Sequence, residues 1–542
     1  MTSIDWIIVI AVNFAIFAYG IWCSRRTKTS LDWFLGGRSL PFWIVGLSMF
    51  ATSVDGGEYV SINGQSYKDG LSVIAGLMAG ATIGSIVAAF IVVPRLYLGG
   101  HFTNAEFLEV RFGTTARIFS VFVQIQYRTS VLATIMVALQ IVMVEIAGLD
   151  QTSAWIVVIG LALATSVYAA WGGLKTIAFT DVLLSVVMLT GIIVLWSVVW
   201  NKSGGFEGFG GIIDKMKGDT GMPYRAGDQI PGGSHPVVVL VGWILVVTGY
   251  FVVNHTQTMK LFGVRSLWDL KMAALLGGAL ISGTFFFSGG LGLFGRNLFP
   301  DLPKPDMIYP RMVNELLAPG LKGLVLAGLV SASISTFTGI GAALSALLTK
   351  DLYARCLVRD ASESHYLKVS RISTILIVAV SFLYVPFILN SKTMVDFFIS
   401  ITSVFVTPLM TLYLVGVLTS VHRRSGMAGL FAGAGYGLLR LADTFLESSI
   451  LPWWFTEKFA AFVWSASITA LAMLLASLAL GWKNQPEQKA RQENSAEEQK
   501  NSADTKDTTD DSHHLTPILL RPGLWGFFLI FTTFGCIFLF FW

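Results

Sequence analysis

Two short segments combine small, hydroxyl-bearing and acidic residues inside otherwise apolar stretches. The first, residues 48–58 (SMFATSVDGGE), places Asp55 and Glu58 around a Gly-Gly pair. Each glycine weakens a helix by about 1 kcal/mol relative to alanine. A helix that opens here frees backbone carbonyls, and inside a membrane a bound cation can satisfy them. The segment therefore predicts either an interrupted helix with a cation site or a kinked packing helix with a partly exposed acidic end.

The second segment is residues 329–339 (LVSASISTFTG), in which Ala332, Ser335 and Thr336 have i, i+3, i+4 spacing. That spacing places the three residues on one helix face. Two hydroxyls on one face supply hard oxygens, which suit a hard cation such as Na⁺. A divalent ion would require carboxylates, and this face has none. Taken alone, the pattern is more typical of hydrogen bonding between membrane helices than of a sodium site.

The elements that position these residues follow from the composition. Of 542 residues, 54% are hydrophobic and 13% are charged, whereas soluble chains carry about 25% charged residues. This composition predicts an integral membrane protein surrounded by lipid. The net charge of +4 and the absence of a basic, aromatic-interleaved patch give no reason to expect nucleic acid. Three separated cysteines and no recognisable catalytic motif predict a protein that is not an enzyme and has no cofactor.

About fourteen apolar stretches are long enough to span a membrane, among them residues 4–23, 152–172 and 180–200. Lys and Arg are enriched in alternate connecting segments, which predicts a multi-pass protein of the plasma (inner) membrane with both termini outside. Residues 483–516 have alternating charges and almost no apolar side chains. They are expected to form a disordered cytoplasmic linker.

Four further segments occur in a characteristic order: 32–39 (DWFLGGRS), 103–113 (TNAEFLEVRFG), 171–181 (WGGLKTIAFTD) and 350–353 (KDLY). Together with the two segments above, they resemble the solute:sodium symporter family, which includes sodium–glucose, sodium–proline and sialic acid carriers. The resemblance covers nearly the whole chain.

The resemblance implies an all-α membrane fold with a LeuT-like core of two inverted five-helix repeats. One helix would precede the core and about three would follow it. The first helix of each repeat, here 41–64 and 237–258, would be interrupted at mid-membrane. The expected units are 1–40 (extra N-terminal helix and inner loop), 41–200 (first repeat), 201–236 (outer loop), 237–420 (second repeat), 421–482 (two helices), 483–516 (linker) and 517–542 (C-terminal helix).

Carried over by position, the resemblance implies one sodium site. Its ligands would be the backbone carbonyls of Ala51, Val54 and Ala332 and the hydroxyls of Ser335 and Thr336. Some relatives have a second ion site, and the matching residues here are Asp181 and Thr338. Gly339 stands where those relatives have serine. We therefore expect one sodium ion per cycle, with Asp181 and Thr338 left as a candidate second ion or proton site.

The solute would bind between the interrupted helices. Asn254 matches a solute-contacting asparagine in sugar carriers, and Arg128 resembles an arginine that grips a carboxylate in sialic acid carriers. A carboxylate at such a site favours a solute with an amine or several hydroxyls. The candidate solute-binding residues are Ser53, Asp55, Glu58, Gln124, Arg128, Asn254 and His255.

The expected function is sodium-coupled import of a small solute by alternating access. The solute could be a sugar, an amino acid, a carboxylate or an amine, and the other partners would be Na⁺ and membrane lipid. Two alternatives stay open. One is a transporter-like sensor or receptor, which would need a signalling domain, and the other is a proton-coupled symporter that uses Asp181.

Overall fold

The computed structural model describes residues 1–25, 29–215, 225–228, 234–390, 394–445, 451–482 and 521–541. Within these ranges the regular elements are all helices, joined by one isolated parallel bridge between Leu40 and Val264. The expected all-α class is confirmed. The predicted linker 483–516 and parts of the predicted outer loop 201–236 lie outside the described residues. The described part of that loop includes α10 (Gly205–Lys215).

Ten helices in the described part of the chain are long and apolar enough to cross a membrane, and two shorter apolar helices, Phe42–Ser53 and Phe405–Leu418, accompany them. The predicted count of fourteen is therefore not confirmed and stays a prediction. The ten are α1 (Ser3–Ser24), α5 to α6 (Leu71–Leu98), α8 (Thr114–Glu145), α9 (Gln151–Lys202), α11 (Pro236–Val253), α13 (Leu267–Leu298), α15 with η4 (Leu321–Leu357), α16 to α17 (Glu363–Leu389), α21 (Ala460–Leu480) and the C-terminal helix α23 with its extension (Pro522–Leu539).

Further α-helices of the described residues lie between these spans along the chain. They are α2 (Ser30–Leu35), α3 (Phe42–Ser53), α4 (Gly56–Asp69), α7 (Asn104–Phe112), α12 (His255–Phe262), α14 (Ile308–Leu316), α18 (Met394–Leu418), α19 (Ser425–Phe445) and α20 (Trp453–Thr456).

The first predicted interruption is present between α3 and α4. Val54 (φ −111°, ψ 99°) and Asp55 (φ −111°, ψ 179°) are extended, so the helix that ends at Ser53 restarts only at Gly56. The Asp55 carboxylate accepts a hydrogen bond from the Glu58 amide at 3.0 Å and thereby caps the new helix. The chain therefore breaks where the polar residues and the glycine pair meet.

The second predicted interruption lies between α11 and α12. Asn254 is extended (φ −65°, ψ 109°), and its side chain accepts from the Thr256 amide at 3.0 Å as the cap of α12. Two broken helices, one in each half of the core, match the arrangement expected of an inverted repeat.

The two predicted spans 152–172 and 180–200 form a single continuous element, α9, that contains one kink. A straight helix of 52 residues would extend about 78 Å, more than twice the hydrocarbon thickness of a bilayer. Gly173 has φ 62°, a left-handed conformation that favours glycine, and a Cβ there would lie 2.7 Å from the Cα of Trp33. The kink at Gly173 therefore divides α9 into two spans.

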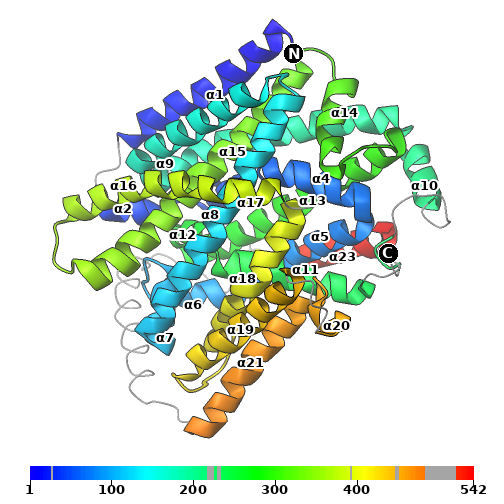
Figure 1. The fold of residues 1–542 in the computed structure, drawn as a ribbon. Coiled ribbons are helices and arrows are strands. Elements are labelled where there is room, and N and C mark those ends of the chain that lie inside the picture. Colours follow the sequence, from blue (N-terminus) through cyan, green and yellow to red (C-terminus); the bar gives the residue numbers. More distant parts are fainter. Residues whose placement is uncertain are drawn as a thin grey trace.

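Helix α15 is the central element, and nearly all of it is buried. It packs against α9, α1 and α16, while α3 lies against α9, α13 and α15. Figure 1 shows α1 beside α9 and α15 on one side of the molecule, with α19 and α21 on the opposite side. The C-terminal helix α23 packs on α5 and α13, where the Thr533 and Thr82 hydroxyls are 2.8 Å apart.

Candidate functional site

The break after α3 lies directly against the hydroxyl face of α15. The Thr52 and Ser335 hydroxyl oxygens are 3.3 Å apart, and the Thr336 hydroxyl donates to the Ala332 carbonyl at 3.1 Å. All five residues predicted to hold sodium are buried. The structure therefore brings the two segments of the predicted cation site together, although their role as ligands stays a prediction. The five are Ala51, Val54, Ala332, Ser335 and Thr336.

The break also releases the carbonyls that the prediction uses. In a continuous helix the carbonyl of residue i accepts from the amide of residue i+4. The partner of Ala51 would be Asp55, which is extended, and the partner of Val54 would be Glu58. The Glu58 amide donates instead to the Asp55 side chain. Both carbonyls therefore lose their helical partners and can serve a cation.

Asp181 is fully buried behind this site and pairs with a lysine that was not among the predicted site residues. Lys260 of α12 is 1% exposed, and its Nζ lies 2.9 Å from Asp181 Oδ2. Lys260 also donates to the Ser48 carbonyl at 2.6 Å and to the Thr52 hydroxyl. A charge within a membrane segment costs roughly 2.5–3.5 kcal/mol, but Lys260 lies just beyond the predicted span 237–258, so no such signal marked it in the sequence.

The hydroxyls of Ser48 and Ser335 complete the surroundings of Asp181. Ser48 donates to Oδ2 at 2.5 Å and Ser335 donates to Oδ1 at 2.6 Å. Thr338, the other candidate for a second ion site, donates its hydroxyl to the Ser335 carbonyl at 2.9 Å. Asp181 therefore bridges α3, α12 and α15, because its carboxylate accepts hydrogen bonds from Ser48, Lys260 and Ser335.

Gly339 is where the chain departs from the family pattern, and the structure gives the reason. A Cβ at this position would lie 2.6 Å from Thr52 Cγ2. A serine would therefore overlap the threonine that lies beside Lys260 and Ser335.

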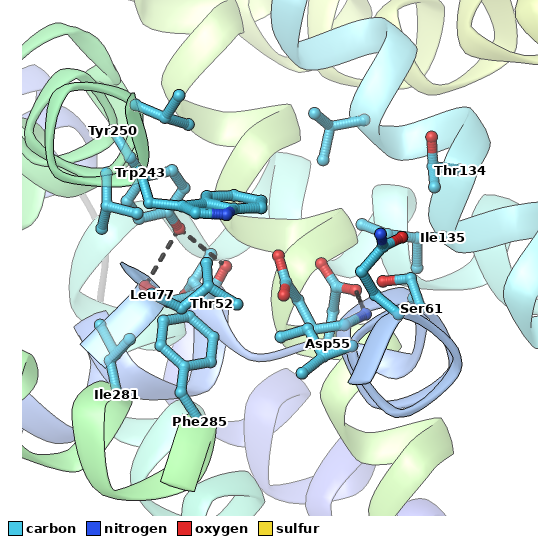
Figure 2. Close-up of a pocket in the computed structure, with 18 of the residues that line it drawn as sticks. Thr52, Asp55, Ser61, Leu77, Thr134, Ile135, Trp243, Tyr250, Ile281 and Phe285 are labelled. Carbon is cyan, nitrogen blue, oxygen red and sulfur yellow. Dashed lines mark hydrogen bonds between the residues drawn. The ribbon is translucent and has the colours of Figure 1, made fainter. Parts of the chain in front are cut away.

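A cavity of about 100 Å³ lies next to the first helix break. One water molecule needs about 10–15 Å³ measured in this way, so the cavity has room for a small organic solute. Figure 2 shows Asp55 on one side of this space and the Trp243 indole on the other. Four of the predicted solute-binding residues line the cavity: Ser53, Asp55, Glu58 and Arg128.

Aromatic side chains of α8 and α11 form much of the wall. The Tyr250 hydroxyl donates to Ser53 Oγ at 3.0 Å and accepts from Gln257 Nε2 at 2.9 Å. The dashed lines that start at Tyr250 in Figure 2 mark the hydrogen bonds that this hydroxyl donates. The guanidinium carbon of Arg128 lies 5.5 Å from the ring centroids of both Tyr127 and Tyr250. None of these aromatic residues is distinguishable in the sequence, because their positions resemble ordinary core positions of apolar helices.

The other three predicted solute residues form a separate buried cluster and do not line this cavity. Gln124 donates to Asn104 Oδ1 at 3.2 Å and accepts from the His255 amide at 2.9 Å, while Asn254 caps α12. Four residues along a helix correspond to about 6 Å. Gln124 is therefore one turn of α8 away from Arg128, where it satisfies the second helix break.

An ion network joins the predicted inner loop motif to the end of the central helix. Arg117 of α8 donates to Asp351 Oδ1 at 2.6 Å and to Glu109 Oε2 at 2.5 Å. Arg355 donates to Glu109 Oε1 at 2.8 Å. Burial alone would raise the pKa of Glu109, but the hydrogen bonds from Arg355 and Arg117 outweigh it and lower this pKa to about 2. The Glu109 carboxylate therefore stays ionised and holds α7, α8 and η4 together.

The fold and the geometry together define a class of protein: a multi-pass membrane protein in which two broken helices pack against a buried central helix, with a cavity beside the first break. Residues 33–433 match the sodium:solute symporter family. The chain belongs to the sodium:solute symporter family.

Relatives and solved structures agree with this assignment. The sodium/glucose cotransporter 4 of Danio rerio is 27% identical over 482 residues, which are 82% of this chain and 73% of the relative. The sodium/myo-inositol cotransporter 2 of Rattus norvegicus is 26% identical over 481 residues, which are 82% and 71% of the two chains.

A solved Na⁺-coupled sialic acid symporter in a substrate-bound outward-open state has a TM-score of 0.75 at 19% identity. That match covers 88% of this chain and 98% of the other. A nucleobase-cation-symport-1 family transporter in a closed conformation gives a TM-score of 0.52 at 14% identity, covering 85% and 97%. Both structures share the fold.

Several predictions are thereby confirmed. The relatives are transporters and not enzymes, and Na⁺ is the coupling ion, with no cofactor indicated. The chain is an integral membrane protein, as its apolar helices and its family indicate. It works on a small solute together with sodium.

Proposed function

We propose that this protein imports one small organic solute together with one Na⁺ in each transport cycle, by alternating access across the plasma membrane. The observation that carries the proposal is the contact between the broken end of α3 and the hydroxyl face of α15, where Thr52 and Ser335 are 3.3 Å apart. Both termini would face the outside, as the distribution of Lys and Arg predicts.

The sodium ion would bind the carbonyls of Ala51, Val54 and Ala332 and the hydroxyls of Ser335 and Thr336. Five oxygens without a carboxylate suit a monovalent hard cation better than a divalent one. The Thr336 hydroxyl donates its hydrogen to the Ala332 carbonyl, which leaves the lone pairs of the hydroxyl oxygen free for the ion.

A single sodium ion supplies enough energy for uptake. Moving one charge through 100 mV yields about 2.3 kcal/mol. A roughly tenfold sodium gradient adds about 1.4 kcal/mol. The sum of about 3.7 kcal/mol sustains an approximately 500-fold gradient of a neutral solute.

Two observations support a stoichiometry of one. The ammonium of Lys260 lies 2.9 Å from Asp181, so the carboxylate that serves a second ion in some relatives already has a fixed cation here. The Cβ clash at Gly339 excludes the serine hydroxyl that such a site would use. Asp181 and Thr338 are therefore proposed as a structural support for the sodium site.

The solute would occupy the cavity beside Ser53, Asp55, Glu58 and Arg128. Gln124, Asn254 and His255 would instead stabilise the second helix break, which has to keep its shape while the core moves.

The proposal is tested by thermal unfolding of the purified protein in Na⁺ and in K⁺ at equal ionic strength. Because a ligand that binds only the folded state stabilises it by RT ln(1 + [L]/Kd), the midpoint should rise with Na⁺ and not with K⁺. Ser335→Ala should abolish most of this sodium-dependent shift.

Ser345→Ala is the matched control, since it removes another buried hydroxyl of α15, one that donates to the Ser370 carbonyl at 2.9 Å. Equal shifts in Na⁺ and K⁺, or a full sodium shift in Ser335→Ala, would contradict the proposal. Stabilisation by protons in place of sodium would favour the proton-coupled alternative.

A further inference from the structure

The lining of the cavity next to the first helix break contains one more carboxylate than cationic side chains. Its charged lining residues are Asp55, Glu58 and Arg128, which together have a formal charge of −1. The rest of the lining is uncharged and largely apolar. An isolated buried charge is costly unless it is paired, so a positively charged group in the cavity would balance the additional carboxylate in its ionised form.

The two carboxylates differ in how they are satisfied by the protein. Asp55 caps α4 by accepting from the Glu58 amide at 3.0 Å. Among the described residues, the Glu58 carboxylate makes no hydrogen bond and no ion pair, although most of the surface of Glu58 is enclosed. The Asp55 carboxylate therefore has a structural role as a helix cap, whereas the Glu58 carboxylate has none and lines the cavity.

Arg128 does not neutralise either carboxylate directly. Within the described part of the chain, no ion pair of 4.0 Å or less joins Arg128 to Asp55 or Glu58. Its guanidinium is held by aromatic rings, 5.5 Å from the centroids of Tyr127 and Tyr250. The side chain is 2% exposed, and its Nε has no hydrogen-bond partner in the described residues.

The opposite wall suits a cation with an additional polar group. Trp243, Tyr250, Phe251 and Phe285 line the cavity, and aromatic faces attract cations within about 6 Å of the ring. The Trp243 indole is 4% exposed, and its Nε1 has no hydrogen-bond acceptor among the described residues. Figure 2 shows this indole across the cavity from Asp55. An N–H that is buried and unpaired at a cavity wall indicates a ligand acceptor, such as a hydroxyl.

We infer that the transported solute carries a positively charged amino or alkylammonium group, which binds between the Asp55–Glu58 carboxylates and the aromatic wall formed with Trp243 and Tyr250. The inference rests on the proposed function, because it assigns the chemistry of the same solute site. A neutral polyol would leave the Glu58 charge unpaired, and an anion would meet two carboxylates. The solute would thus differ in charge from the glucose and myo-inositol in the names of the relatives.

A cationic solute also changes the driving force. The solute then crosses the membrane potential with its own charge in addition to that of Na⁺. Each 100 mV therefore raises the attainable accumulation by about 50-fold beyond that of a neutral solute.

The test uses three pairs of probes that match in size and differ in charge: D-glucosamine and D-glucose, ethanolamine and ethylene glycol, choline and 3,3-dimethylbutan-1-ol. Each is added to the purified full-length protein in Na⁺, and the shift of the thermal midpoint is titrated. At least one cationic member should stabilise the protein at a concentration at least tenfold below that needed for its neutral partner.

The same titration with Glu58→Gln should weaken the cation at least tenfold. Glu315→Gln is the matched control, because it neutralises a surface carboxylate that pairs with Arg311. Even if Glu58→Gln does not fold, the comparison of charged and neutral probes on the native protein still decides the question.

A neutral sugar or polyol that stabilises the protein in Na⁺ as well as its amine partner would overturn the inference and leave sodium-coupled symport intact. An amine that binds Glu58→Gln as tightly as the native protein would also overturn it. Loss of the proposed function itself would show separately, as the absence of any difference between Na⁺ and K⁺.

Discussion

Replacing Lys260 by methionine should destabilise the protein strongly, because the lysine ammonium is fully used. An ammonium has three donors. Here they reach Asp181 Oδ2 at 2.9 Å, the Ser48 carbonyl at 2.6 Å and the Thr52 hydroxyl. Methionine has similar length and no charge, so it would leave Asp181 buried without a counter-ion. Removing one partner of a buried pair costs about 3–5 kcal/mol.

The measurement is the half-life of the folded protein in detergent at a fixed elevated temperature, followed by size-exclusion chromatography. Since about 1.4 kcal/mol corresponds to a factor of ten, Lys260→Met should shorten this half-life at least tenfold. Combining it with Asp181→Asn should restore part of the loss, because the second change removes the unpaired charge. Lys368→Met, which removes an exposed lysine of α16, is the control and should change little.

The same variant tests the stoichiometry. With the ammonium gone, Asp181 would be available to a second sodium ion, so the sodium titration of Lys260→Met should become steeper, with a Hill coefficient that rises from near 1 toward 2. A variant as stable as the native protein, with an unchanged sodium titration, would refute the claim that Lys260 acts as a fixed cation at Asp181.

Three further predictions concern single contacts. Gly339→Ser should cost about 1–3 kcal/mol through overpacking, and adding Thr52→Ser, which removes the clashing methyl group, should recover most of it in the same inactivation assay. Glu109→Gln should lower the thermal midpoint by a constant amount above about pH 5. The difference should vanish as the pH falls from about 4.5 toward 2, because a carboxylate with a depressed folded pKa stabilises only while it is ionised. Tyr250→Phe removes the hydrogen bond to Ser53 and should weaken solute binding in Na⁺ by up to about tenfold, while the midpoint of a sodium titration without solute stays unchanged.

The first helix break was predictable from the sequence, because its causes are local, whereas the second followed from the family resemblance. Gly56, Gly57 and a capping Asp55 lie next to one another, and each acts on the backbone within one turn. The hydroxyl face of α15 was equally predictable from the sequence, since i, i+3, i+4 spacing determines which side chains share a helix face. The contact between the two segments followed from the family resemblance, not from the pattern alone.

The partners of Asp181 and the wall of the cavity could not be predicted in this way. Lys260 is 79 residues from Asp181, and only the packing of both α9 and α12 against α3 brings the two together. Read along the chain, Lys260 looks like one more basic residue near the end of an apolar stretch. For Gln124, a shift of one helical turn separates the solute cavity from a hydrogen bond to the second break.

The position of the first break gives a physical reason why sodium and solute binding should depend on each other. Val54 offers its carbonyl to the proposed sodium site, and the adjacent Asp55 caps the helix that carries Glu58 into the cavity. An ion that holds the Val54 carbonyl restricts the dihedral angles that set the direction of α4. The solute then meets carboxylates that are already ordered, so less conformational entropy is lost when it binds. Because such coupling is reciprocal, a bound solute should tighten sodium binding by the same factor.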